Sequence, residues 1–329
     1  MHSIFPTSYS TLEPSALARY IETQYGFPNV TCTFLVRGVG DTYLVHTTAA
    51  QYVLRIYRSS HRTEGNIAAE AALLLALKEG EVPVSYPLTD KDGQYLQALP
   101  AAEGTRYAML FTFAEGASVN ILSPHQLSVL GTQMARFHNV AAGLRLQDPR
   151  WTFDLDTTLF NPLAAARDYF QHDVAGYEWL LQAAGEVHAQ LDPQGLSSGY
   201  CHFDFLPKNF HFDAQDRITF FDFDFFGKGW LVQDIMTFRQ QLLIDRLMGR
   251  LTETQAAQAY DQLLDAYTRV RPLRDAELKA IPWLGLGFWL FYMGFHMTHD
   301  QFLPLMQPHT LHSRTGLIRK IVEMDRAWQ

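Results

Sequence analysis

The chain has 329 residues, of which 47% are hydrophobic and 18% are charged, and its formal net charge is −8. This composition can form a large buried core, so it excludes an intrinsically disordered chain, and the length favours about two domains. The absence of a basic stripe argues against a nucleic-acid partner, and an acidic balance suits a cationic or neutral small molecule. The two cysteines, Cys32 and Cys201, lie far apart in sequence, which favours a reducing, cytoplasmic location.

The N-terminal third is predicted to form a small antiparallel sheet with one prominent helix. A first helix is expected over Thr11–Tyr25, because Gly26 and Pro28 follow it. The remaining elements expected here are strands at Thr31–Arg37, Thr42–Thr47 and Gln51–Tyr57, a helix at Arg62–Glu79, a short hairpin around Asp92-Gly93, and a strand at Arg106–Phe113.

The character of the sequence changes after Gly116, and the rest is predicted to be mostly helical. Helical patterns cover Ser123–Ala142 and Asn161–Leu191, a compact region of short aromatic strands runs from Tyr200 to Phe226, and helices dominate from Trp230 onward. The fold class is therefore α+β, with a small antiparallel-sheet lobe followed by a larger, mostly helical lobe.

One apolar segment could form either a buried core helix or a membrane-spanning helix. Ile281–Met297 contains no charged residue and is rich in Trp and Phe, but it falls short of the roughly 20 residues that span a bilayer. We expect a buried core helix, with His296 and His299 as core or pocket residues rather than metal ligands. Its aromatic residues suit either core packing or a cation-binding surface; they are Trp283, Phe288, Trp289, Phe291, Tyr292 and Phe295.

The strongest chemical signal is an H-x-D-x-x-x-x-N loop at His202–Asn209, followed by a D-x-D strand ending at Asp224. Phosphoryl transfer needs a carboxylate that orients the attacking hydroxyl, and oxygen ligands that hold Mg²⁺ against the phosphates. Asp204 suits the first role, and Asn209 and Asp222 suit the second. Asp224 is either a second metal contact or a loop-capping residue. A hairpin in which these side chains only satisfy turns is the structural alternative.

This region resembles the catalytic segment of the aminoglycoside phosphotransferase family, which includes choline kinases and type II homoserine kinases. The resemblance implies a bilobal protein-kinase-like fold, ATP and Mg²⁺ as cofactors, Asp204 as the catalytic residue, and Asn209 and Asp222 as metal ligands. It also implies a structural role for His202. The family usually has glycine where this chain has Phe203, a departure that changes loop packing without removing a reacting group.

The resemblance extends upstream into the predicted sheet. Gly38 and Gly40 are similar to the family's nucleotide loop, in which glycines let backbone N–H groups approach phosphates. Arg55 corresponds to the phosphate-binding cation of the third strand, where an arginine can bind phosphate through two N–H groups. Glu70, in an Ala- and Leu-rich helix, resembles the carboxylate that pairs with this cation, so we predict an Arg55–Glu70 contact within about 4 Å.

The adenine-binding hinge is expected near Phe111 and Phe113, because Tyr107–Gly116 resembles the family hinge. Downstream, Asp234 resembles an aspartate that braces the catalytic loop, although a carboxylate in the first turn of a helix is also ordinary. Lys208 is interpreted as a solvated lysine rather than a phosphate contact.

These assignments predict two lobes, residues 1–113 for nucleotide binding and residues 114–329 for the catalytic loop, metal site and acceptor pocket. The predicted function is transfer of the ATP γ-phosphate to a hydroxyl of a small, amine-bearing molecule of the homoserine, choline, ethanolamine or aminoglycoside type. No membrane or nucleic-acid partner is expected. The alternatives are a nucleotide-binding regulatory pseudokinase and a protein Ser/Thr kinase; the latter lacks a D-F-G to A-P-E segment after Asp222.

Overall fold

The computed structural model describes residues 5–148 and 150–328, and the chain divides into two compact units. The first unit contains the chain up to Ala117 together with residues 145–150 and 210–224. The second contains residues 118–144, residues 151–209 and the chain from Phe225 onward. This division differs from the predicted one at residue 113, chiefly because segment 210–224 joins the N-terminal unit.

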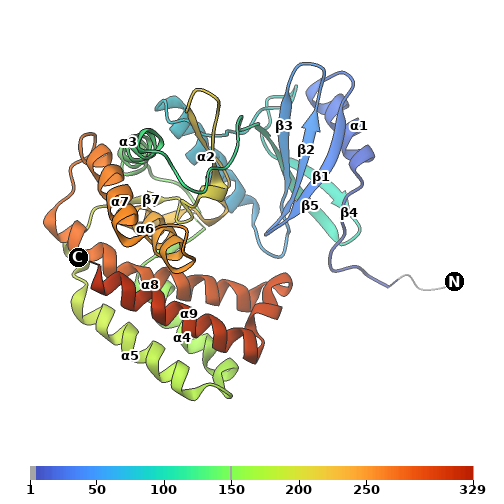
Figure 1. The fold of residues 1–329 in the computed structure, drawn as a ribbon. Coiled ribbons are helices and arrows are strands. Elements are labelled where there is room, and N and C mark those ends of the chain that lie inside the picture. The colour runs from blue at the N-terminus through green and yellow to red at the C-terminus, as the bar shows by residue number, and fades with distance from the viewer. Residues whose placement is uncertain (1–4, 149, 329) are drawn as a thin grey trace. The chain divides into compact units, whose positions relative to one another are not determined.

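The first unit is built on a five-stranded antiparallel sheet in the order β1-β2-β3-β5-β4 (Figure 1). Its strands are β1 (Thr31–Arg37), β2 (Asp41–His46), β3 (Gln51–Ile56), β4 (Gln97–Ala101) and β5 (Gly104–Thr112), and its helices are α1 (Pro14–Tyr25) and α2 (Glu64–Glu79). Leu17 and Ile21 of α1 form a buried core with Tyr43, Val45 and Leu54 of the sheet. The predicted antiparallel lobe with one prominent helix is therefore present.

Local capping explains where the helices begin. Pro14 stands in the first turn of α1, and the Thr63 hydroxyl of α2 accepts a hydrogen bond from the Asn66 amide at 3.2 Å. Both helices thus begin two or three residues later than predicted. The hairpin predicted at Asp92-Gly93 is wrong: the β-hairpin in this region joins β4 to β5. Asp92-Gly93 forms instead a local turn in which the Asp90 carboxylate accepts from backbone amides.

Backbone hydrogen bonds attach the hairpin β8 (Phe210–Phe212) and β9 (Ile218–Phe220) to the first unit. The Phe220 amide donates to the Pro83 carbonyl at 2.8 Å, and the Ser85 amide donates to the Phe220 carbonyl at 2.8 Å. On the other strand, Phe212 and Ala117 exchange two such bonds at 3.0 and 3.1 Å. These pairings join segments more than 90 residues apart in sequence, which local patterns do not reveal.

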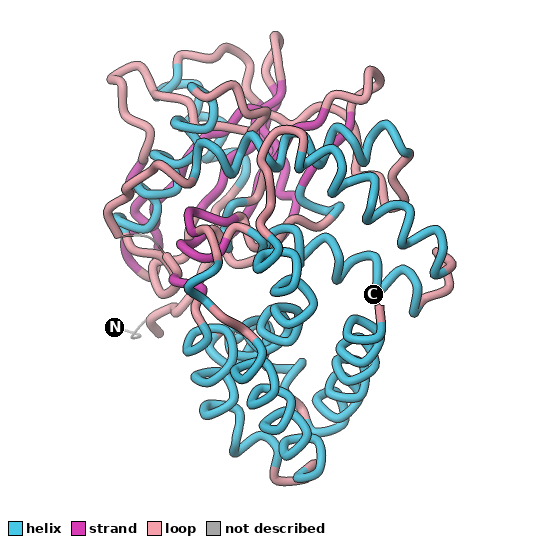
Figure 2. The backbone as a smooth tube through the Cα atoms, turned by 90° about the vertical axis from the view of Figure 1, so that its left-hand side faces the viewer, coloured by secondary structure: helices cyan, strands magenta, loops and turns pink. Residues whose placement is uncertain are grey.

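The second unit is mainly helical (Figure 2). Its helices are α3 (Pro124–Ala141), α4 (Asn161–Ala166), α5 (Val174–Gln190), α6 (Val232–Leu247), α7 (Glu253–Thr268), α8 (Asp275–Thr298) and α9 (Pro308–Ala327). A small sheet in the order β6-β10-β7 carries strands β6 (Thr152–Phe153), β7 (Ser198–Cys201) and β10 (Gly227–Trp230). The helix predicted over Asn161–Leu191 is interrupted after Ala166, because Asp173 caps a new helix by accepting from the Gly176 amide at 3.1 Å.

Helix α8 lies in the middle of this unit, where it packs against α4, α5, α6 and α9 (Figure 1). Leu286, Leu290 and Met293 belong to a core cluster that α4, α5 and α9 complete. By length and composition α8 is the one described helix that could cross a membrane, but 61% of its most apolar 18-residue window is buried inside the protein. This burial agrees with the core helix that we expected over Ile281–Met297.

A buried ion pair ties the first unit together across its sheet. The Arg106 guanidinium of β5 contacts the Asp41 carboxylate of β2 at 3.0 Å, and both side chains are at most 1% exposed. Arg106 also donates to the carbonyls of Ser10, Ile56 and Tyr57 at 2.7 to 3.3 Å. This guanidinium therefore connects the segment before α1 with the centre of the sheet.

We predict that Arg106→Met lowers the free energy of unfolding by about 3–5 kcal/mol, because Asp41 would lose its buried counter-ion and keep only the ion pair with Arg37, which is 3.6 Å away and 45% exposed. The matched control is Arg217→Met, since Arg217 pairs with Asp213 at the surface and its side chain is 77% exposed. Loss of an exposed pair costs at most about 1 kcal/mol. Urea unfolding followed by fluorescence measures both variants; equal losses would contradict a structural role for the buried pair.

Candidate active site

The H-x-D-x-x-x-x-N segment forms a tight loop that begins at the end of β7. The Asp204 carbonyl accepts the Leu206 amide at 2.7 Å, and a short 3₁₀ turn at Pro207–Asn209 follows. The Asn209 Nδ2 group donates to Asp204 Oδ2 at 2.7 Å and to the Asp204 carbonyl at 2.9 Å. Lys208 Nζ also lies 2.8 Å from Asp204 Oδ2. The loop thus holds one oxygen of the predicted catalytic carboxylate through two side chains, those of Asn209 and Lys208.

The second carboxylate oxygen of this aspartate is left available. Asp204 Oδ1 is buried and has no hydrogen-bond partner within residues 5–148 and 150–328. A buried carboxylate oxygen without a partner is costly, because it has lost water without gaining a donor. The geometry therefore suits a donor from a bound molecule, such as an alcohol O–H group.

Asp234, at the start of α6, braces the loop from behind. Its Oδ1 accepts from the Phe203 amide at 2.6 Å, and its Oδ2 accepts from the His202 amide at 2.9 Å. Asp234 is fully buried, and the predicted bracing role agrees with these contacts. Hydrogen bonds to a charged acceptor contribute about 1.5–3 kcal/mol each, so they fix the two residues that precede Asp204.

A buried histidine completes this support. His138 Nε2 lies 3.0 Å from Asp234 Oδ2, and His138 Nδ1 lies 2.7 Å from the Tyr267 hydroxyl. Burial lowers the pKa of His138 despite the hydrogen bond to Asp234. A neutral ring that donates from Nε2 to the carboxylate and accepts from Tyr267 satisfies all three groups.

In the first unit, Arg55 of β3 reaches Glu70 of α2, with Arg55 Nη1 3.4 Å from Glu70 Oε1. The predicted contact between these two side chains is therefore present. The same guanidinium contacts Asp224 and lies 3.2 Å from Asp222 Oδ1, and the Tyr57 hydroxyl donates to Glu70 Oε2 at 2.9 Å. Burial would lower the pKa of Arg55, but the three carboxylates raise it.

Arg150 is a member of this cluster that the sequence did not reveal. Its guanidinium contacts Glu70 and lies 3.3 Å from Asp224 Oδ1, and it donates to the carbonyls of Phe223 and Asp224 at 3.2 Å. No local motif marks this residue, since it follows a stretch without periodicity. It connects α2 to the segment that carries Asp222.

Asp224 lies among guanidinium groups. Arg55 and Arg150 contact its carboxylate, and Arg62 Nε lies 3.6 Å away. Burial would raise the pKa of Asp224, but the three arginines outweigh burial and lower it. Three guanidinium groups thus surround this carboxylate, and its role as a second metal contact stays a prediction. It does not cap a loop, the other role considered from the sequence, because its described partners are arginine side chains.

The predicted nucleotide-loop and hinge residues lie at the ends of β1 and β5. The Gly38 amide donates to the Gly40 carbonyl at 2.9 Å, and a Cβ on Gly40 would lie 2.6 Å from the Ile56 carbonyl oxygen. Packing against Ile56 therefore requires a glycine at position 40, whether or not this loop binds phosphate. Phe111 is buried, whereas the backbone N–H and C=O of Phe113 make no hydrogen bond in the part of the chain that the structure describes.

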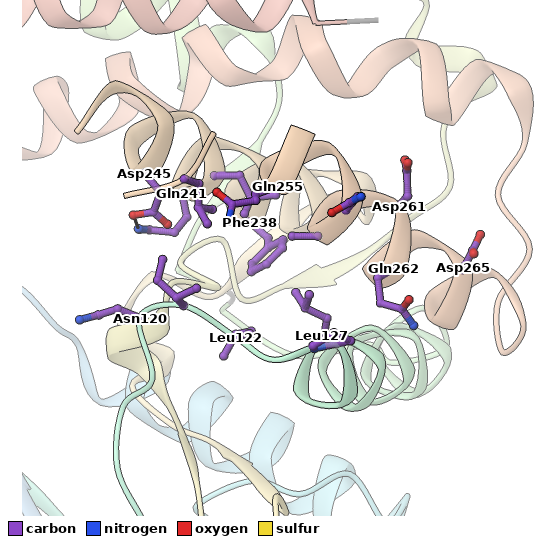
Figure 3. A pocket seen from close by; sticks show the side chains of 16 residues that line it. Asn120, Leu122, Leu127, Phe238, Gln241, Asp245, Gln255, Asp261, Gln262 and Asp265 are labelled. Atoms are coloured by element: carbon purple, nitrogen blue, oxygen red, sulfur yellow. Dashed lines mark hydrogen bonds between the residues drawn. The ribbon is translucent and has the colours of Figure 1, made fainter. Parts of the chain in front are cut away.

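A cavity of about 600 Å³ occurs elsewhere in the second unit, between the segment Asn120–Leu127, α6 and α7 (Figure 3). Leu127 and Phe238 point into it, and Asp245 at its edge accepts from Arg250 and Gln241. The residues that line it include none of those predicted to bind nucleotide or metal or to act in catalysis.

A family model described as the phosphotransferase enzyme family matches residues 31–273. The chain belongs to this family. This phosphotransferase is accordingly a small-molecule kinase that acts on a hydroxyl group, and the matched range includes β1, the catalytic loop and Asp234.

Individual relatives agree with this assignment. An uncharacterised protein of Synechocystis sp. is 33% identical over 282 residues, which cover 84% of this chain and 76% of the relative. A homoserine kinase of Parvibaculum lavamentivorans is 26% identical over 255 residues, covering 77% and 75% of the two chains. The structure of a microcompartment-associated aminopropanol kinase superposes with a TM-score of 0.76 at 20% identity, covering 95% and 97%. The protein-kinase-like fold is confirmed.

Phe203 explains how this phosphotransferase departs from the usual glycine. Its φ is 63°, in the left-handed region that a bulky residue rarely adopts. The ring is fully buried, stacks on Phe153 at 3.8 Å between centroids, and lies 5.1 Å from Phe291. Aromatic packing therefore offsets a backbone strain of about 1–3 kcal/mol.

We predict that Phe203→Gly destabilises the phosphotransferase by about 2 kcal/mol, since loss of the ring outweighs relief of strain. Phe203→Ala removes the same ring but keeps the left-handed penalty, so it should be less stable than the glycine variant. Chemical unfolding of the parent protein and the two variants gives the order of their stabilities. A glycine variant as stable as the parent, or as unstable as the alanine variant, would contradict this balance.

We predict that Glu70→Gln lowers turnover about 100-fold, because Arg55 and Arg150 lose the carboxylate that positions them. The control is Glu64→Gln on the same helix, where the side chain accepts only from the exposed Tyr107 hydroxyl at 2.8 Å. Steady-state kinetics and thermal unfolding are measured together. Normal turnover in Glu70→Gln would show that the contact has no part in positioning Arg55.

Proposed function

We propose that this chain transfers the γ-phosphate of ATP to the hydroxyl of a small, amine-bearing metabolite, with Mg²⁺ as the metal. The proposal rests on the hydrogen bonding of the Asp204 carboxylate. One of its oxygens is held by the loop, and the other is buried without a partner in the described residues. A loop that positions one oxygen and leaves the other for a hydroxyl donor is suited to phosphoryl transfer to an alcohol.

Asp204 is the proposed base. Its Oδ1 would accept the hydrogen bond of the acceptor hydroxyl and then its proton as the oxygen attacks phosphorus. Asn209 and Lys208 bind Oδ2, so they orient the carboxylate without competing for Oδ1. Asp234 prevents the loop from relaxing, and positioning accounts for most of the catalysis in this reaction class.

The donor atoms of Asn209 and Asp222 fit Mg²⁺. Because Asn209 Nδ2 donates to Asp204, its Oδ1 is the atom left for a cation, and the Asp222 side chain is 46% exposed. Amide and carboxylate oxygens are the ligands that Mg²⁺ prefers. When bound, the ion would neutralise charge on the phosphates.

Nucleotide recognition is proposed for the first unit. Arg55 is the phosphate contact, held in orientation by Glu70, which Tyr57 and Arg150 fix in turn. The Phe113 backbone offers one N–H and one C=O for the edge of the base. Gly38 and Gly40 remain the proposed phosphate loop, because their lack of side chains leaves room for phosphate oxygens.

An amine-bearing acceptor is supported by two kinds of relative. Homoserine kinase and aminopropanol kinase are named for alcohols that also carry an amine. The acidic net charge of −8 is consistent with a substrate of this type.

We predict that Asp204→Asn lowers turnover about 10²–10⁴-fold, the usual effect of removing a positioned base, while Mg·ATP binds with nearly unchanged affinity. The control is Asp192→Asn, an exposed residue that caps a short turn by accepting from the Gln194 amide. ADP release measures turnover, and titration calorimetry measures Mg·ATP binding. Near-normal turnover in Asp204→Asn would remove the basis of the proposed mechanism.

A further inference from the structure

The segment that precedes α1, residues 9–12, is attached to the sheet of the first unit through side-chain hydrogen bonds. The Ser10 amide and hydroxyl donate to the Glu103 carboxylate at 3.1 and 2.6 Å, and the Leu12 carbonyl accepts from the Tyr43 hydroxyl at 2.7 Å. Tyr43 belongs to β2, and Glu103 lies in the turn between β4 and β5. These contacts fix the course of the 9–12 segment along the sheet.

Two residues of this segment contact the residues that flank the glycine loop, residues 38–40. Arg37 is the last residue of β1 and Asp41 is the first residue of β2, so the glycine loop joins them. The Tyr9 hydroxyl donates to the Asp41 carboxylate, and the Arg37 guanidinium donates to the Thr11 hydroxyl. Arg37 and Asp41 also form an ion pair, with Arg37 Nε 3.6 Å from Asp41 Oδ1. The 9–12 segment therefore contacts both ends of the glycine loop.

The half-buried ring of Tyr9 lies among cations. The guanidinium carbons of Arg37, Arg58 and Arg106 lie 4.5, 4.2 and 5.2 Å from its centroid. Arg58 follows β3 and Arg106 belongs to β5, so a single ring contacts cations from three parts of the sheet, and cation–π attraction favours this position. Burial and the neighbouring Asp41 raise the pKa of Tyr9, so its hydroxyl keeps its proton and remains a donor at neutral pH.

The glycine loop supplies little to fix its own conformation. Glycine has the most backbone freedom of any residue, and Gly38 and Gly40 have no side chain that could anchor the loop. Within the described residues the Gly38 amide donates to the Gly40 carbonyl at 2.9 Å, and Gly40 packs against the Ile56 carbonyl. The two flanking residues therefore determine how firmly the loop is held, and Tyr9 contacts both of them.

We propose that Tyr9 is a positioning residue for ATP binding, because it fixes Arg37 and Asp41 and so holds the glycine loop in the conformation that binds phosphate. This inference rests on the proposed function, in which the glycine loop contacts the phosphates of ATP. A loop that is ordered before ATP binds loses less conformational entropy on binding, so the affinity for ATP depends on Tyr9. The proposed base Asp204 belongs to the second unit, and acceptor binding should not depend on Tyr9.

Nucleotide binding without an acceptor tests the proposal, with the non-hydrolysable analogue Mg·AMP-PNP as the probe and titration calorimetry of the full chain as the measurement. We expect Tyr9→Phe, which keeps the ring and loses the hydroxyl, to weaken binding about three- to tenfold. Tyr9→Leu also loses the cation–π contacts and should weaken binding about 10- to 100-fold. The control is Tyr20→Phe, which loses the hydrogen bond to Gln97 Oε1 at 2.8 Å in the same unit, away from the loop, and should bind as the parent does.

Steady-state kinetics separate positioning from a general loss of structure. With homoserine and 3-amino-1-propanol as acceptors, we expect Tyr9→Phe to raise KM for ATP by the same factor as the loss of affinity, while kcat and the acceptor KM stay close to those of the parent. Partial unfolding would instead lower the amount of active protein, and with it kcat, without raising KM for ATP alone. Thermal unfolding of the same samples measures that loss directly.

The outcomes distinguish this inference from the proposed function. Equal affinity of the parent and both Tyr9 variants for Mg·AMP-PNP would overturn the positioning role and leave the kinase function intact. A loss in Tyr20→Phe as large as that in Tyr9→Phe, or an equal rise in both KM values, would also overturn it. If the parent does not bind Mg·AMP-PNP, the proposed function fails, and the inference fails with it. Should Tyr9→Leu not fold, the comparison of Tyr9→Phe with Tyr20→Phe decides.

Discussion

The catalytic loop depends on one buried carboxylate, that of Asp234. It accepts the backbone amides of His202 and Phe203, the two residues before Asp204. Each charge-assisted bond contributes about 1.5–3 kcal/mol, which together with the packing of the Phe203 ring exceeds the cost of a left-handed phenylalanine. The strained backbone turns Asp204 so that Asn209 and Lys208 reach one oxygen and the other remains buried. Without Asp234, the loop would lose the two charge-assisted hydrogen bonds that offset this strain.

In the first unit, a cluster of buried positive and negative side chains holds the proposed phosphate-binding residue Arg55 in place. Arg55, Arg62 and Arg150 surround Glu70 and Asp224, with Asp222 at the exposed side of the cluster. Three cations and three carboxylates balance, so the interior carries little net charge although every member is ionic. Removing one partner would leave an uncompensated charge, which is the costly case for buried pairs. Such a cluster keeps Arg55 oriented for an anionic ligand.

The sequence predicts the structure best where the functional residues lie close together in one motif. Spacing and the family resemblance predict the loop from His202 to Asn209, the Arg55–Glu70 contact and the bracing of the loop by Asp234. The structure contains all three. Their roles toward nucleotide and metal stay proposals. Strands β1, β2, β3 and β5 were located within one or two residues, because β-branched and aromatic runs are bounded by turn residues there, whereas β4 was not predicted.

The remaining features depend on contacts between distant segments. Arg150 follows an irregular stretch, and only the fold brings it to Glu70 and Asp224. The same reason explains why the sequence did not show that Asp224 lies among arginines or that segment 210–224 joins the N-terminal unit.

The most direct test of the central claim is to observe the phosphorylated acceptor itself. ³¹P NMR of the full chain with Mg·ATP and a preferred hydroxy amine should show a phosphomonoester signal that grows in equal amount with ADP, with coupling to the protons on the carbon that carried the hydroxyl. Formation of ADP with inorganic phosphate alone, or no consumption of ATP with any hydroxylated amine, would contradict transfer to an alcohol.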